Sequence, residues 1–99
     1  MILFQFCNAD VSETAFAQDR DDLAALLAEQ YGACIATIAD DNGMTVAEYI
    51  AAWRAMDPSE TLRVRDERGN DADERTVAQW IAEWMATEGK RGLFTSSDV

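Results

Sequence analysis

The carboxylates of this chain are numerous and closely spaced enough to form a chemical site. Asp and Glu make up 19 of the 99 residues, and they crowd at 40–43 (Asp-Asp-Asn-Gly) and along 66–74. Clustered carboxylates can hold a cation, and paired ones inside a cleft can transfer protons. The segment 40–43 lacks the alternating ligands and the bidentate Glu of a calcium loop, so it predicts a turn. The run 66–74 predicts a solvated turn with helix-start acids, and a contact surface or a weak metal site is the alternative.

Other catalytic chemistry has little support in the residues. The chain has no histidine, which removes the usual general base, the usual catalytic triads and most zinc sites. Cys7 and Cys34 stand alone in apolar segments, so we expect two reduced, buried thiols. The five glycines stand singly and form no phosphate-binding loop. The sequence therefore predicts no enzyme, with no catalytic, cofactor-binding or metal-binding residue.

The charge is the strongest signal in the sequence. The 19 acids face 8 bases, for a formal net charge of −11, and before Ile50 nine acids accompany a single base, Arg20. An apolar content of 48%, with three Trp, four Phe and two Tyr, excludes a disordered acidic tail. A chain of this length forms one domain, which we expect to span 1–95, with a flexible tail at 96–99.

Targeting signals are not evident in the sequence. The apolar start, residues 1–8, is short and lacks the basic flank of a signal peptide. No apolar run approaches the length of a membrane span, and anionic lipids would repel so acidic a surface. We therefore expect a cytoplasmic protein that binds no membrane.

The first half of the chain predicts two strands and two helices. Residues 2–7 read as a buried strand, and Ser12 as the cap of a helical turn that reaches residue 16. Asp19 or Asp21 begins a helix with Leu and Tyr at helical spacing, which Gly32 ends. Residues 33–39 predict a second strand. Thr45 with Glu48 forms a capping box for a helix that ends at Pro58.

The second half predicts one strand, one helix and a short final strand. Residues 61–66 alternate apolar and charged side chains, as in a strand with one wet face, and 67–70 predict a turn. Asp71 or Asp73 caps a helix whose apolar stripe is Val77, Trp80, Ile81, Trp84 and Met85, and which ends at Gly89. This stripe favours core packing, and one partly exposed Trp would instead indicate a partner groove. Leu93 and Phe94 predict the last strand.

This element order predicts an α+β domain. We expect two layers, with three helices packed on a small sheet of three or four strands. A parallel sheet covered on both faces is the alternative, and it is disfavoured because so short a chain has few residues with which to cover two faces.

The charge predicts a cationic partner. Self-repulsion costs stability, and solubility requires far less charge than this chain carries. Grooves that bind nucleic acids are lined with Lys and Arg, and a scaffold of carboxylates can occupy one in place of DNA. An acid-rich proteome is the alternative explanation. The expected contact residues are Asp19, Asp21, Asp22, Glu29, Asp40, Asp41, Asp66, Glu67, Asp71, Asp73 and Glu74.

In size and charge the chain resembles the small acidic inhibitors of bacterial immunity that phages and mobile elements carry. The residues behind the resemblance are the acidic stretches 19–22 and 66–74. These inhibitors include anti-CRISPR proteins and DNA-mimic antirestriction proteins, which share no common motif or fold. The resemblance implies a partner in the host cytoplasm, a multi-subunit CRISPR surveillance complex whose entry for DNA the chain would block.

An adaptor or antitoxin-like protein that binds a basic protein without imitating DNA is the second hypothesis. Mimicry predicts acids on one contiguous surface, whereas an adaptor predicts an exposed apolar groove around Trp80 or Trp84. In both cases we expect a monomer or homodimer. Direct nucleic-acid binding is disfavoured, because the scattered bases lie in a strongly negative field.

Overall fold

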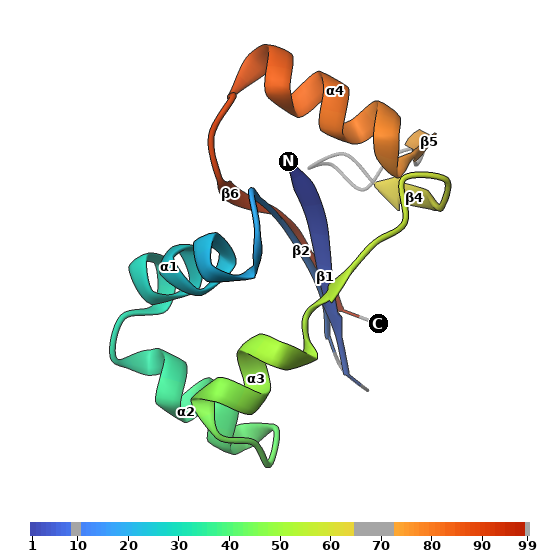
Figure 1. Cartoon of the computed structure of the whole chain (residues 1–99). Helices are drawn as coiled ribbons and strands as arrows, with labels where there is room; N and C mark the ends of the chain where they lie inside the picture. The colour runs from blue at the N-terminus through green and yellow to red at the C-terminus, as the bar shows by residue number, and fades with distance from the viewer. Residues whose placement is uncertain (9–10, 65–72, 99) are drawn as a thin grey trace.

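The computed structural model describes residues 1–8, 11–64 and 73–98, with the backbone alone for 95–98. These residues form six strands and four helices (Figure 1). In chain order they are β1 (Ile2–Cys7), β2 (Val11–Ala17), α1 (Arg20–Tyr31), α2 (Cys34–Asp41), α3 (Val46–Ala52), β3 (Arg54–Ala55), β4 (Thr61–Val64), β5 (Asp73–Thr76), α4 (Val77–Thr87) and β6 (Gly92–Asp98).

The strands form a main sheet and a separate hairpin-like pair. The main sheet has the order β3-β1-β2-β6, and all its neighbours are antiparallel. Strands β4 and β5 pair only with each other. The predicted α+β class is confirmed, but the described residues hold four helices and two sheets, where three helices on one sheet were expected.

Side-chain alternation in β1 and β2 divides the core between the two faces of the main sheet. Phe4 and Phe6 of β1 lie in one cluster with the leucines of α1 and with Tyr49 and Trp53. Leu3 and Phe16 lie in a second cluster with Val77 and Trp80 of α4. Successive strand residues point to opposite faces, so both faces are buried. The expected two layers are therefore wrong: α1–α3 cover one face, and α4 with the β4–β5 pair covers the other.

Two predicted helix starts are confirmed by their caps. The Asp19 carboxylate accepts a hydrogen bond from the backbone N–H of Asp22 at the start of α1. Thr45 and Glu48 form the reciprocal bonds of a capping box at α3. The start of α4 differs from the prediction, because Thr76 caps it while Asp73 belongs to β5.

Two local predictions are wrong. Residues 12–16 lie in β2, not in a helical turn, because they pair with β1 on one side and with β6 on the other, at the centre of the sheet. Residues 33–39 lie in α2, not in a strand. A short apolar run does not distinguish a strand from a helix, and Ile35, Ile38 and Ala39 recur at helical spacing to pack on the first cluster.

The ends of two elements also differ from expectation. Helix α3 stops at Ala52, well before Pro58, because Trp53 is extended. This turn sends Trp53 to one core cluster and Met56 to the other. Strand β6 runs to Asp98 and pairs with β2, where a flexible tail was expected from residue 96. The predicted turn 67–70 and residue 99 lie outside the described residues. Among the helices described, none is long and apolar enough to cross a membrane.

Candidate functional site

The layer formed by α1, α2 and α3 carries most of the predicted contact acids. Between Asp19 and Ala52 there are seven carboxylates and one base, Arg20. The Arg20 guanidinium donates to the backbone carbonyls of Ile50 at 2.9 Å and Trp53 at 2.6 Å, and it lies 5.3 Å from the centroid of the Phe4 ring. The single base of this layer therefore joins α1 to the end of α3.

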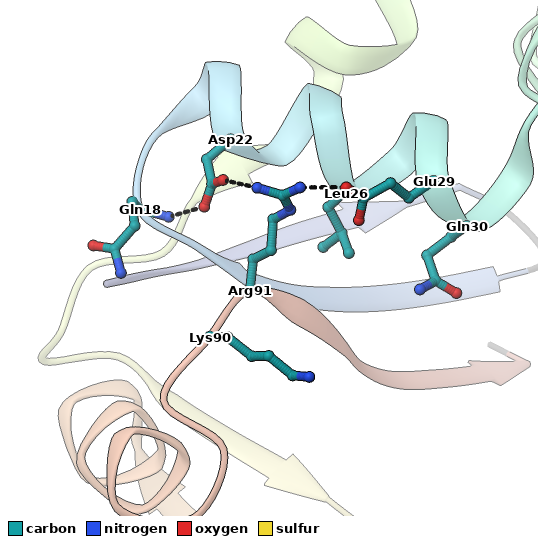
Figure 2. A pocket seen from close by; sticks show the side chains of 7 residues that line it. All are labelled: Gln18, Asp22, Leu26, Glu29, Gln30, Lys90 and Arg91. Atoms are coloured by element: carbon teal, nitrogen blue, oxygen red, sulfur yellow. Dashed lines mark hydrogen bonds and ion pairs between the residues drawn. The ribbon is translucent and has the colours of Figure 1, made fainter.

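Arg91 binds two of the predicted contact acids, Asp22 and Glu29 (Figure 2). Arg91, just before β6, donates to Asp22 at 2.7 Å and also pairs with Glu29, two helical turns further along α1. The backbone N–H of Gln18 donates to the other oxygen of Asp22 at 2.9 Å. The Gln18 bond first, and Arg91 second, hold the pKa of Asp22 below its usual range. Through Arg91, Asp22 and Glu29 therefore connect α1 to the start of β6.

This arrangement lines an open hollow of about 480 Å³ between α1 and the segment before β6 (Figure 2). The lining includes Gln18, Leu26, Gln30 and Lys90 beside the Asp22–Arg91–Glu29 bridge. Lys90 extends away from the bridge in Figure 2. The hollow's charged groups neutralise one another, so it presents no surplus of one sign to a ligand.

Three other predicted acids of this layer are exposed. The side-chain carboxylates of Asp21, Asp40 and Asp41 have no hydrogen-bonding or ion-pair partner within the part of the chain that the structure describes. Asp21 lies in the first turn of α1, where the helix dipole favours a carboxylate. Asp40 and Asp41 lie in the last turn of α2, where the helix dipole disfavours a carboxylate and where no basic residue is present. Local helix stability therefore does not account for these two residues.

The remaining predicted acids are not brought to this layer. Asp73 and Glu74 lie on β5, and Asp73 pairs with Arg75 at 2.8 Å. The strand pair β4–β5 packs with the second core cluster, on the other face of the main sheet. Asp66, Glu67 and Asp71 lie outside the described residues. The predicted acids that the structure places are thus divided between two faces of the sheet.

Glu13 is a carboxylate that the sequence analysis did not single out. It lies half-buried on β2, on the face covered by α1–α3, and the Tyr31 hydroxyl donates to it at 3.4 Å. Burial raises the pKa of Glu13 above its ordinary value, and burial with the nearby Glu13 carboxylate raises the pKa of Tyr31. Glu13 and Asp41 both line a small hollow of about 150 Å³. Glu13 was missed because residues 12–16 were predicted as a helical turn, whereas Glu13 lies opposite Phe6 of β1, whose ring belongs to the first cluster.

An aromatic hollow of about 210 Å³ lies between α4 and β6. It is lined by Trp80, Trp84 and Phe94, with Glu83, Thr87 and Glu88 around them. The apolar stripe predicted for this helix supplies both tryptophans. Trp80 is buried, with 8% of its surface exposed, whereas Trp84 is only partly buried. The structure thus combines core packing with a partly exposed Trp.

The cysteines are free, as expected, but both are exposed and not buried. The Cys7 thiol lies 3.4 Å from the Ser12 hydroxyl across the β1–β2 pair. Among the side chains that the structure describes, those of residues 1–8, 11–64 and 73–94, no three His, Cys, Asp or Glu gather as metal ligands would.

Scans against protein-family models, curated proteins and solved structures found no match to this chain.

Proposed function

We propose that this protein is a non-enzymatic inhibitor that binds a positively charged DNA-binding groove and blocks the binding of DNA. Its target would be a bacterial defence machine, of which the multi-subunit CRISPR surveillance complex is the leading candidate. The observation that carries the proposal is the charge of the α1–α3 layer, where seven carboxylates accompany one base that is already bound to backbone carbonyls.

The disposition of the bases supports this proposal. Arg54 donates to Glu60 at 3.0 Å, Arg75 pairs with Asp73, and Arg91 bridges Asp22 and Glu29. These arginines therefore add little positive charge that a partner could meet. Asp40 and Asp41 are exposed at the end of α2 against the helix dipole, as expected of residues whose role is to contact a partner.

Electrostatic binding of this kind has measurable consequences. Complementary charges accelerate association and are screened by salt, with a screening length of about 10 Å at 0.1 M ionic strength. No reacting group is required, because a mimic acts only by occupying the groove.

The test is capture of partners from bacterial lysate on the immobilised chain, with low-salt and high-salt washes and mass spectrometry of the bound proteins. We expect a DNA-binding complex that high salt releases. Asp40→Asn should weaken its capture about two- to five-fold, the effect of one exposed charge pair. The matched control Glu74→Gln removes one exposed carboxylate from the other face of the sheet and should leave capture nearly unchanged. Equal losses in the two variants would refute the proposed surface.

The aromatic hollow favours an adaptor as the second candidate function. Trp84 is partly exposed beside Phe94 and Glu88, which provides an apolar contact with a charged edge. An adaptor that uses this hollow would retain one partner through the high-salt wash, because apolar burial is not screened. Salt resistance, combined with indifference to Asp40→Asn, would favour the adaptor over the inhibitor.

A further inference from the structure

The aromatic hollow between α4 and β6 is formed before any ligand arrives. The ring of Trp84 stacks on Phe16, with centroids 4.5 Å apart and planes inclined by 17°. The Phe94 ring lies 5.4 Å from the ring of Trp80 and 5.9 Å from that of Trp84. Mutual packing of this kind fixes the rings, so a ligand would pay little for ordering them.

Both indole N–H groups at the hollow are already satisfied. Trp80 Nε1 donates to the carbonyl of Leu62 at 2.9 Å, and Trp84 Nε1 donates to the carbonyl of Lys90 at 2.7 Å. Gly92 permits this position of Trp84, because a Cβ there would lie 2.8 Å from the indole Cζ2. The hollow therefore offers a ligand ring surface rather than indole donors.

The edge of the hollow is negatively charged. Glu88 is exposed and binds no side chain among the described residues, and Glu83 binds Arg75. The Arg75 guanidinium also lies 4.9 Å from the centroid of Trp80. Two residues of the lining, Glu83 and Trp80, thus already hold an arginine of this chain, by an ion pair and by ring contact.

We propose that the hollow binds the guanidinium group of an arginine from a basic protein partner. A guanidinium is planar, stacks on aromatic faces and donates two parallel hydrogen bonds to a carboxylate, whereas an ammonium does not have this shape. Glu88 is the carboxylate it would meet, and the net charge of −11 attracts such a partner. The inference goes beyond the proposed function, because it rests on the opposite face of the sheet and requires no imitation of DNA.

The test is a titration of the full chain with N-acetyl-arginine methylamide, followed through the three indole ¹⁵N–¹H signals. We expect the Trp84 and Trp80 signals to shift and saturate, with a dissociation constant on the order of 1 mM, at the weak end of the usual scale. The Trp53 signal should not move, because that ring is fully buried in the other core cluster. The citrulline analogue, which has the same shape without the charge, should produce no saturable shift.

Variants locate the contact without disturbing the core. Glu88→Gln should weaken arginine binding about two- to five-fold, and the control Glu74→Gln should not. Equal binding of the citrulline or lysine analogue, or uniform shifts of all three indoles, would overturn the assignment. Shifts of the Trp84 signal with protein concentration alone would assign the hollow to a second copy of the chain, which would also overturn it. A mimicry test that fails while this titration succeeds would separate the two proposals.

Discussion

Gly92→Ala tests whether close packing of Trp84 against β6 at the aromatic hollow stabilises the fold. The added Cβ would lie 2.8 Å from Trp84 Cζ2 and 3.2 Å from Cη2. Carbon atoms pack best at about 3.5–4.0 Å, so the ring or the strand must move by at least ~0.7 Å. Gly92 does not lie in the left-handed region, so alanine meets no backbone strain there.

The magnitude follows from two opposing terms. Overpacking costs about 1–3 kcal/mol, and it applies here because Trp84 is fixed by Phe16, Phe94 and the bond to the Lys90 carbonyl. Replacing glycine by alanine restricts the unfolded chain and recovers about 0.4–1 kcal/mol. We therefore expect the free energy of unfolding to fall by about 1–2 kcal/mol, which lowers Tm by roughly 4–16 °C for a domain of this size.

The assay is urea unfolding followed by circular dichroism, carried out as a double-mutant cycle with Trp84→Phe. The phenyl ring is smaller than the indole, so Gly92→Ala should cost less in that background, with a coupling energy above about 0.5 kcal/mol. A change below ~0.3 kcal/mol for Gly92→Ala alone, or equal costs in both backgrounds, would refute the packing argument.

Three further predictions concern other parts of the molecule. Burial raises the pKa of Glu13, so the folded state binds its proton more tightly than the unfolded state and stability falls as pH rises above about 4.3. Glu13→Gln should therefore raise the free energy of unfolding at pH 7 and leave it unchanged at pH 3; a loss at pH 7 would contradict this. The bonds from Gln18 and Arg91 lower the pKa of Asp22, so its contribution is present above about pH 3.9 and is lost as pH falls through the folded-state value. Asp22→Asn should destabilise more at pH 7 than at pH 3 in the same assay, and equal losses would count against the bridge. Cys7 and Cys34 are exposed, so a chromogenic disulfide reagent should titrate two thiols in the native protein, whereas titration only after unfolding would show them buried.

Local signals in the sequence predicted the elements whose causes are local. The carboxylate of Asp19, the Thr45–Glu48 capping box and the stripe of α4 each act within a few residues, and α1, α3 and α4 form where they indicate. Residues 12–16 and 33–39 were assigned wrongly because their short patterns suit a strand or a helix. Tertiary contacts decided between them, through pairing of β2 on both sides and packing of α2 on the first cluster.

The candidate site was predictable in composition but not in arrangement. The sequence identifies the acids of α1 and α2. It gives no sign that Arg91, near the other end of the chain, forms ion pairs with Asp22 and Glu29. Likewise, the two tryptophans of α4 were visible as a stripe, whereas Phe94 completes their hollow only through the pairing of β6 with β2. Both features depend on contacts between residues far apart in the sequence.

Competition with DNA tests the central claim most directly. A DNA-binding complex captured from lysate would be purified and loaded with labelled duplex, and the chain would be titrated in at several salt concentrations. We predict that the chain displaces the duplex, that displacement weakens as salt rises, and that Asp40→Asn combined with Asp41→Asn impairs displacement. Binding of the chain to the complex while the duplex stays bound would contradict it.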